Sequence, residues 1–161
     1  MKSDSRSYPT RVVGCDGEDY AALQLMGTTQ LHIAIVEDHP VLQDALRELV
    51  ERLPEVAGCT VLVSAEAALA ELERSVPDLI LIDLSLPGMD GISLIAELRK
   101  RFPALPCAIL SGHDSRSYVG QAFAAGASGY LLKGDPVEIE RGIAAILAGE
   151  RYLSEGLKQP A

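Results

Sequence analysis

The chain has 161 residues, of which 48% are hydrophobic and 23% are charged, and its formal net charge is −9. This length fits one domain with a single core, and the negative charge without a basic stripe argues against direct nucleic acid binding. No apolar run reaches the roughly 18 residues of a membrane span, and the N-terminus lacks the apolar segment of a signal peptide. We therefore expect a cytoplasmic protein without a membrane contact.

From Leu31 onward, short apolar runs alternate with amphipathic stretches, which is typical of βα units around a parallel sheet. The predicted strands and the helices that follow them are, in chain order, 31–36 and 41–53, 59–63 and 65–74, 78–83 and 92–102, 106–111 and 115–125, and 128–133 and 136–149. Five such pairs are too few for an eight-fold barrel. They predict a doubly wound α/β fold of the flavodoxin-like (βα)5 type, with strand order 2-1-3-4-5.

Two segments flank this predicted domain, which spans residues 31–150. Residues 1–30 show no sustained periodicity and are expected to form a flexible extension, within which Met26 is an alternative start. Residues 151–161 are expected to be a tail, or the beginning of a linker to an output domain that this chain lacks. The sequence therefore predicts one folded domain with two short appendages.

The candidate functional residues follow the predicted strands at their carboxyl ends. The first strand is followed by Glu37 and Asp38, the third ends in Asp83, the fourth ends in Ser111, and the fifth ends in Lys133. In an open parallel sheet, ligands bind outside the carboxyl ends of the strands, where the strand order reverses. We therefore expect three acids, one hydroxyl and one ammonium group to converge at one edge of the sheet.

Such a cluster of acids requires a cation. Two carboxylates a few ångströms apart repel each other by roughly 3 to 4 kcal/mol at an effective dielectric constant near 20. Mg²⁺ fits, because it is usually held by one or two carboxylates together with water and phosphate oxygens. With the metal in place, Asp83 is a candidate nucleophile toward a phosphoryl group, which Lys133 and Ser111 would contact.

Each of these residues also has an ordinary structural interpretation. An acid after a strand is commonly a turn residue or a helix cap, and a lysine there is usually solvated. The functional interpretation depends on four strand ends that fit a single mechanism.

The pattern resembles the receiver domain of bacterial two-component response regulators, over residues 31 to 150. The matching motifs are VEDHP (36–40), LIDLSLPGMDG (81–91), LSG (110–112) and GASGYLLKG (126–134). The last of these, together with GERYLS (149–154), is similar to the NarL/FixJ-type subfamily, whose receivers usually precede a helix-turn-helix DNA-binding domain.

The resemblance implies that Asp83 accepts a phosphoryl group from a sensor histidine kinase or a phosphotransfer protein. It implies a Mg²⁺ site formed by Asp38, Asp83, the Ser85 carbonyl and, through water, Glu37. It also implies a switch formed by Ser111, Tyr130 and Lys133, in which Tyr130 turns inward when phosphorylation draws Ser111 toward Asp83.

The resemblance also implies that Ser85 and His113 stand at positions that tune the lifetime of the phosphoryl group. No turnover enzyme is expected, only self-phosphorylation and slow autodephosphorylation.

Several alternatives remain open at this stage. The chain could be an excised receiver, a stand-alone receiver, or a pseudo-receiver that acts as an interaction scaffold. An aspartyl phosphatase would usually carry a second Asp where Ser85 stands, and a nucleotide-binding protein would carry a Gly-rich loop where the sequence has EDHP. The apolar residues Val137, Ile139 and Ile143 could pack on the sheet or on a second copy in a homodimer.

Overall fold

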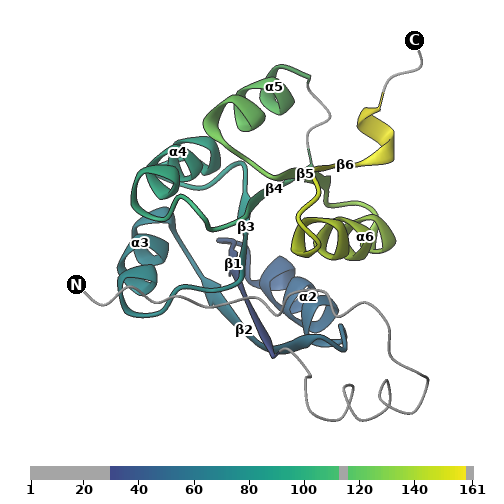
Figure 1. The fold of residues 1–161 in the computed structure, drawn as a ribbon, viewed down its shortest axis with the longest axis horizontal. Coiled ribbons are helices and arrows are strands. Elements are labelled where there is room, and N and C mark those ends of the chain that lie inside the picture. Colours follow the sequence, from purple (N-terminus) through teal and green to yellow (C-terminus); the bar gives the residue numbers. More distant parts are fainter. Residues whose placement is uncertain (1–29, 113–115, 159–161) are drawn as a thin grey trace, which may run out of the picture.

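The computed structural model describes residues 30–112 and 116–158 as a parallel sheet covered by helices on both faces (Figure 1). The strands are β1 (Leu31–Val36), β2 (Val56–Leu62), β3 (Leu79–Asp83), β4 (Cys107–Ser111), β5 (Gly129–Leu132) and β6 (Tyr152–Leu153). The helices are α2 (Pro40–Glu51), α3 (Ala65–Arg74), α4 (Gly91–Arg101), α5 (Arg116–Ala125) and α6 (Pro136–Leu147), followed by a 3-10 turn, η1 (Glu155–Leu157). The expected doubly wound α/β fold is confirmed.

The sheet has the strand order β2-β1-β3-β4-β5-β6, and each neighbouring pair is parallel. Helices α2 and α6 cover one face, whereas α3, α4 and α5 cover the other (Figure 1). The expected order 2-1-3-4-5 is confirmed, with β6 added beside β5. Because the order reverses between β1 and β3, the carboxyl ends of these strands define the edge where a ligand is expected.

Local sequence explains the central elements. Every residue of β3 is buried, because helices cover both faces, and its side chains alternate between two cores: Ile80 and Ile82 pack in one, Leu79 and Leu81 in the other. Pro40 begins α2, where its missing N–H costs nothing. The carboxylate of Asp135 caps α6 by accepting hydrogen bonds from the first backbone amides of that helix.

Some boundaries differ from the predicted ones. Strand β2 begins at Val56, three residues before the prediction, and the sequence pattern does not indicate β6. A two-residue strand is too short to show the alternation by which strands are recognised.

Most of the apolar face of α6 packs on the sheet. Ile139 and Ile143 are buried against the sheet, whereas Val137 is 52% exposed. The expected flexible extension before Gln30 and the proposed role of His113 concern residues outside those the structure describes. None of the helices in the described part of the chain is long and apolar enough to cross a membrane.

Candidate functional site

Strand pairing brings the predicted site residues to one edge of the sheet. Val36 of β1 pairs with Ile82 of β3, so that the following residues, Glu37 and Asp83, lie side by side. On the other side of β3, the amide of Lys133 donates a hydrogen bond to the carbonyl of Ser111 at 3.0 Å. The expected convergence of β1, β3, β4 and β5 at their carboxyl ends is therefore present.

Lys133 lies between two acids. Its Nζ is 2.8 Å from Glu37 Oε2 and 2.9 Å from Asp83 Oδ1, and its side chain is only 18% exposed. Burial works to lower the pKa of Lys133, but the hydrogen bonds to Glu37 and Asp83 outweigh it, and the pKa is raised from its ordinary value. Lys133 therefore carries a firmly held positive charge beside the Asp83 carboxylate.

Asp83 is fixed by the loop that follows it. The Ser85 amide donates to Asp83 Oδ1 at 3.3 Å, and the Asp83 carboxylate is almost entirely buried. Helix α4 begins against the Asp83 backbone, where a Cβ on Gly91 would overlap the Asp83 carbonyl oxygen. A glycine at the start of α4 is thus a condition for the position of the candidate nucleophile.

Glu37 is fully buried, and two neighbours that the sequence analysis gave no role fix its position. The His39 amide donates to Glu37 Oε1 at 3.2 Å, and Gln43 Nε2 donates to the Glu37 carbonyl oxygen at 2.6 Å. Gln43 lies in the first turn of α2, which puts its side chain back over the strand end. The only sequence signal for these roles is their closeness to the acidic pair.

Asp38 supplies the observation that tests whether a metal fits. Its Oδ1 is buried without a hydrogen-bond partner, the only such side-chain atom in the part of the chain that the structure describes. Ligand atoms of Glu37, Asp38 and His39 lie within 4.8 Å of one another, and Asp38 Oδ2 is 3.6 Å from His39 Nδ1. A buried carboxylate oxygen without a partner is a suitable ligand for a hard cation.

The charges of the site agree with this fit. Three carboxylates gather here with one ammonium group: Glu37 and Asp83 contact Lys133, and Asp38 lies beside Glu37. Two formal negative charges therefore remain, which is the charge that a divalent cation neutralises. Asp83 is not part of the group of ligand atoms around Asp38, and its Oδ1 is bound by Lys133.

The two remaining residues of the expected switch are both buried in the domain. Ser111 and Tyr130 have no exposed surface, and Tyr130 packs in the same core as Ala122 of α5 and Leu157 of η1. The structure therefore describes Tyr130 in the inward position, and its expected rotation on phosphorylation stays a prediction.

The comparisons with known proteins agree with this geometry. A family model described as the response regulator receiver domain matches residues 33–146. The chain belongs to this family. Receiver domains are signalling proteins of two-component systems rather than turnover enzymes, and the relatives of this receiver include transcriptional regulators.

Two relatives illustrate the similarity. The receiver is 32% identical over 126 residues to the nitrate/nitrite response regulator protein NarL of Escherichia coli K12, covering 78% of the chain and 58% of NarL. A LuxR-family two-component response regulator from Aurantimonas sp. SI85-9A1 is 36% identical, with a TM-score of 0.77 over 80% of this chain and 92% of that one. The chain thus spans a little over half the length of NarL.

A third comparison concerns a structure with a phosphoryl mimic. The isolated receiver of RcsB from Salmonella enterica serovar Typhimurium, solved in the presence of the phosphomimetic BeF3−, is 25% identical with a TM-score of 0.73. The similarity covers 80% of this chain and 96% of that one.

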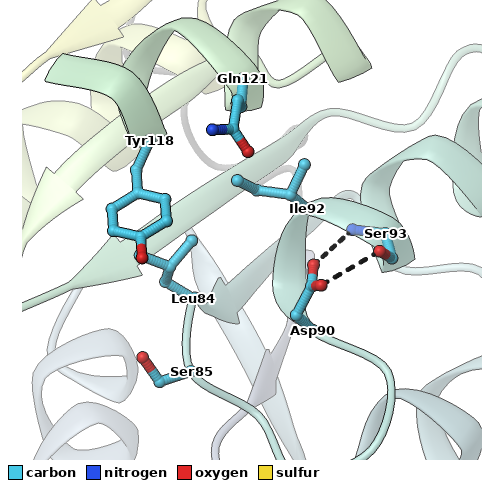
Figure 2. Close-up of a pocket in the computed structure, with 7 residues that line it drawn as sticks. All are labelled: Leu84, Ser85, Asp90, Ile92, Ser93, Tyr118 and Gln121. Atoms are coloured by element: carbon cyan, nitrogen blue, oxygen red, sulfur yellow. Dashed lines mark hydrogen bonds between the residues drawn. The ribbon is translucent and has the colours of Figure 1, made fainter. Parts of the chain in front are cut away.

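A pocket of about 360 Å³ opens beside the loop that follows β3 of this receiver (Figure 2). Ser93 donates to Asp90 through its amide at 2.8 Å and through its hydroxyl at 3.2 Å, so the Asp90 carboxylate is engaged as the cap of α4. The residues that line this pocket are Leu84, Ser85, Asp90, Ile92, Ser93, Tyr118 and Gln121. The pocket exposes the Ser85 side of the loop that follows Asp83.

Proposed function

We propose that this receiver is a phosphorylation-controlled switch in which Asp83 accepts a phosphoryl group from a sensor histidine kinase or a phosphotransfer protein. The observation that carries the proposal is the pair of Asp83 and Lys133, 2.9 Å apart, beside the unpartnered Oδ1 of Asp38. Together they supply a nucleophile, a phosphate-binding cation and an open metal ligand.

The chemistry follows from these positions. An Asp83 carboxylate oxygen attacks the phosphorus of a phosphohistidine, the P–N bond breaks, and the imidazole leaves with the bonding electrons and takes up a proton. Lys133 and the Ser111 hydroxyl bind oxygens of the transferred group. Mg²⁺, held by Asp38, Asp83 and the Ser85 carbonyl, with Glu37 acting through water, would supply charge neutralisation between the carboxylates and the phosphoryl oxygens.

The proposed output is a change of surface that regulates transcription. Phosphorylation adds nearly two negative charges and three acceptor oxygens at the end of β3, which draws Lys133 and Ser111 to new partners. NarL and the transcriptional regulatory protein MctR of Rhizobium johnstonii are both longer than the matched region. A DNA-binding domain outside this chain is therefore the proposed effector.

Two kinds of partner are included in the proposal. Val41 and Val137, which are 80% and 52% exposed, are the second residues of α2 and α6, the helices that follow the site residues at the ends of β1 and β5. They offer apolar contacts to a kinase or phosphotransfer protein that approaches Asp83. Pairing with a second copy is supported by the related RcsB, one structure of which is described as two dimers bound to two parallel DNAs.

The test uses small phosphodonors and intact-mass spectrometry. Acetyl phosphate and phosphoramidate, whose P–N bond resembles that of phosphohistidine, are each incubated with the chain, with and without Mg²⁺. We expect a single Mg²⁺-dependent phosphoryl adduct on the wild type, none on Asp83→Asn, and the wild-type result on Asp90→Asn, which alters an exposed acid of the same loop.

Two results would contradict the proposal. An adduct that persists in Asp83→Asn would place the phosphoryl group elsewhere. The absence of any adduct on a folded wild-type sample with both donors would favour the scaffold alternative.

A further inference from the structure

The segment Tyr152–Lys158, which we name the C-terminal latch, packs along the outer side of β5 (Figure 1). Tyr152 pairs with Gly129 and Leu153 with Tyr130, in a parallel register. Leu157 then enters the core that contains Tyr130 and is only 8% exposed. The latch therefore closes the edge of the strand that leads to Lys133.

A buried acid of α6 anchors the latch. Glu138 Oε2 accepts hydrogen bonds from the Tyr152 hydroxyl at 2.8 Å and from the Glu155 amide at 3.1 Å. Glu138 is 8% exposed, so a carboxylate there needs these donors. The Ser154 side chain is a further hydrogen-bond partner of Glu138, so without the latch this buried charge would lose all three.

Ser154 joins the latch to the strand of the switch. Its Oγ accepts a hydrogen bond from the Leu132 amide at 3.0 Å, and its own amide donates to the Tyr130 carbonyl at 3.1 Å. Leu132 immediately precedes Lys133, whose Nζ bridges Glu37 and Asp83. One peptide bond thus separates a latch contact from a residue of the phosphorylation site.

We propose that the C-terminal latch is a regulatory strap that phosphorylation of Asp83 loosens through Lys133, Leu132 and Ser154. The proposal rests on the proposed function for its trigger, and on the contacts of Ser154 and Glu138 for its mechanism. The latch then binds firmly to β5 while Lys133 bridges the two acids, and loosely once Lys133 binds a phosphoryl group.

The direction of the effect follows from geometry. Lys133 Nζ binds both Glu37 Oε2 and Asp83 Oδ1, so a phosphoryl group on Asp83 changes the partners of Lys133, and we expect the end of β5 to adjust with it. The latch contacts are formed in the unphosphorylated arrangement, and a shift of Leu132 away from Ser154 lengthens the bond from the Leu132 amide to Ser154 Oγ. Phosphorylation therefore weakens the latch rather than strengthening it.

Hydrogen exchange measured by mass spectrometry tests the proposal on the full chain. The amides of Tyr152, Ser154 and Glu155 are all bonded in the latch, so the peptide over 150–158 reports its opening. With acetyl phosphate and Mg²⁺, and with occupancy measured by intact mass, we expect this peptide to exchange about tenfold faster in the phosphorylated chain. Unchanged exchange in a sample with full occupancy would overturn the proposal.

Two variants separate the latch from the proposed function. Ser154→Ala should exchange as fast without phosphorylation as the wild type does with it, while its phosphoryl adduct forms normally; the control Glu140→Gln changes an acid of α6 that is not a partner of the latch. Lys133→Ala should also open the latch without a phosphodonor, because it frees the end of β5. If no adduct forms, the proposed function fails. If the peptide over 150–158 also exchanges as slowly in Lys133→Ala as in the wild type, the regulatory role of the latch is overturned as well.

Discussion

Two buried acids, Glu37 after β1 and Glu138 on α6, have their negative charge compensated in different ways. Glu37 is balanced by the ammonium group of Lys133, which also binds Asp83, and the neighbouring Asp38 Oδ1 has no partner. Glu138 is balanced by a tyrosine hydroxyl and a backbone amide, which are neutral donors. The first acid belongs to a cluster with excess charge, whereas the second belongs to a cluster whose hydrogen bonds are satisfied.

This difference indicates that the cluster around Glu37 can bind a further ligand, whereas the cluster around Glu138 stabilises the fold. A shared cation and an unpartnered oxygen leave room for another ligand, and the energy of the cluster changes when one arrives. A carboxylate with neutral donors gains nothing from a new ion and stabilises one conformation. Substitutions at the two acids and their partners should therefore differ in their effect on stability.

Lys133→Ala should have the largest effect on stability. The change leaves Glu37 and Asp83 facing each other, and loss of one partner from a buried ion pair costs about 3 kcal/mol. Mg²⁺ should restore part of this loss, since it neutralises the same carboxylates. Urea unfolding with and without Mg²⁺ measures both effects, and Lys158→Ala, which removes an exposed ion pair, is the control. Equal losses in the two variants would show that Lys133 stabilises the fold no more than an exposed ion pair does.

Leu157→Ala should destabilise the latch by about 2 kcal/mol, the lower end of the cost of truncating a buried leucine. We expect faster hydrogen exchange over 150–158 and an unchanged phosphoryl adduct. Val137→Ala, at an exposed apolar position, serves as the control and should unfold like the wild type. A loss of phosphorylation in Leu157→Ala would show that the two regions cannot be separated.

The pH dependence of stability should reveal Glu138. Burial acts to raise the pKa of Glu138, but hydrogen bonds from Tyr152, the Glu155 amide and Ser154 outweigh it, and the pKa is lowered from 4.5. A lowered folded-state pKa gives stability that is present above pH 4.5 and lost as the pH falls through the folded value. The unfolding free energies of wild type and Glu138→Gln should therefore differ near neutral pH and converge in acid. A difference independent of pH would contradict the assignment.

The smallest effect is expected from Arg151→Ala. The Arg151 guanidinium lies 5.8 Å from the centre of the Phe123 ring. This contact links the residue that precedes the latch to α5. An exposed cation–π contact contributes about 0.5 kcal/mol. Arg151→Lys keeps the charge, and its free energy of unfolding in urea should lie between those of the wild type and Arg151→Ala. A loss as large as that of Leu157→Ala would mean that the contact does more than cover the ring.

The sequence predicts the acidic cluster better than the latch, for a physical reason. Strands β1, β3 and β4 are continuous apolar runs because helices cover both of their faces, so their ends are visible in the sequence. Parallel strands then bring those ends to one edge, which is why Glu37, Asp83 and Lys133 could be placed together without a structure.

The latch depends on contacts that leave no local pattern. Glu138 reads as an ordinary acid in the first turn of a helix, and only the fold brings Tyr152, 14 residues away, to its carboxylate. Strand β6 has two residues, too few for a period to appear. The roles of His39 and Gln43 are likewise set by the turn into α2, which the sequence places only approximately.

The parallel pairing of β6 with β5 also determines the direction in which the chain runs after β6. A strand that ran antiparallel to β5 would carry the chain back to the amino ends of the sheet, far from Asp83. Because β6 runs the same way as β5, the chain reaches Ser154 beside Leu132, the residue that precedes Lys133. The chain at Ser154 therefore lies one residue along β5 from Lys133, next to the edge that the proposed phosphorylation would alter.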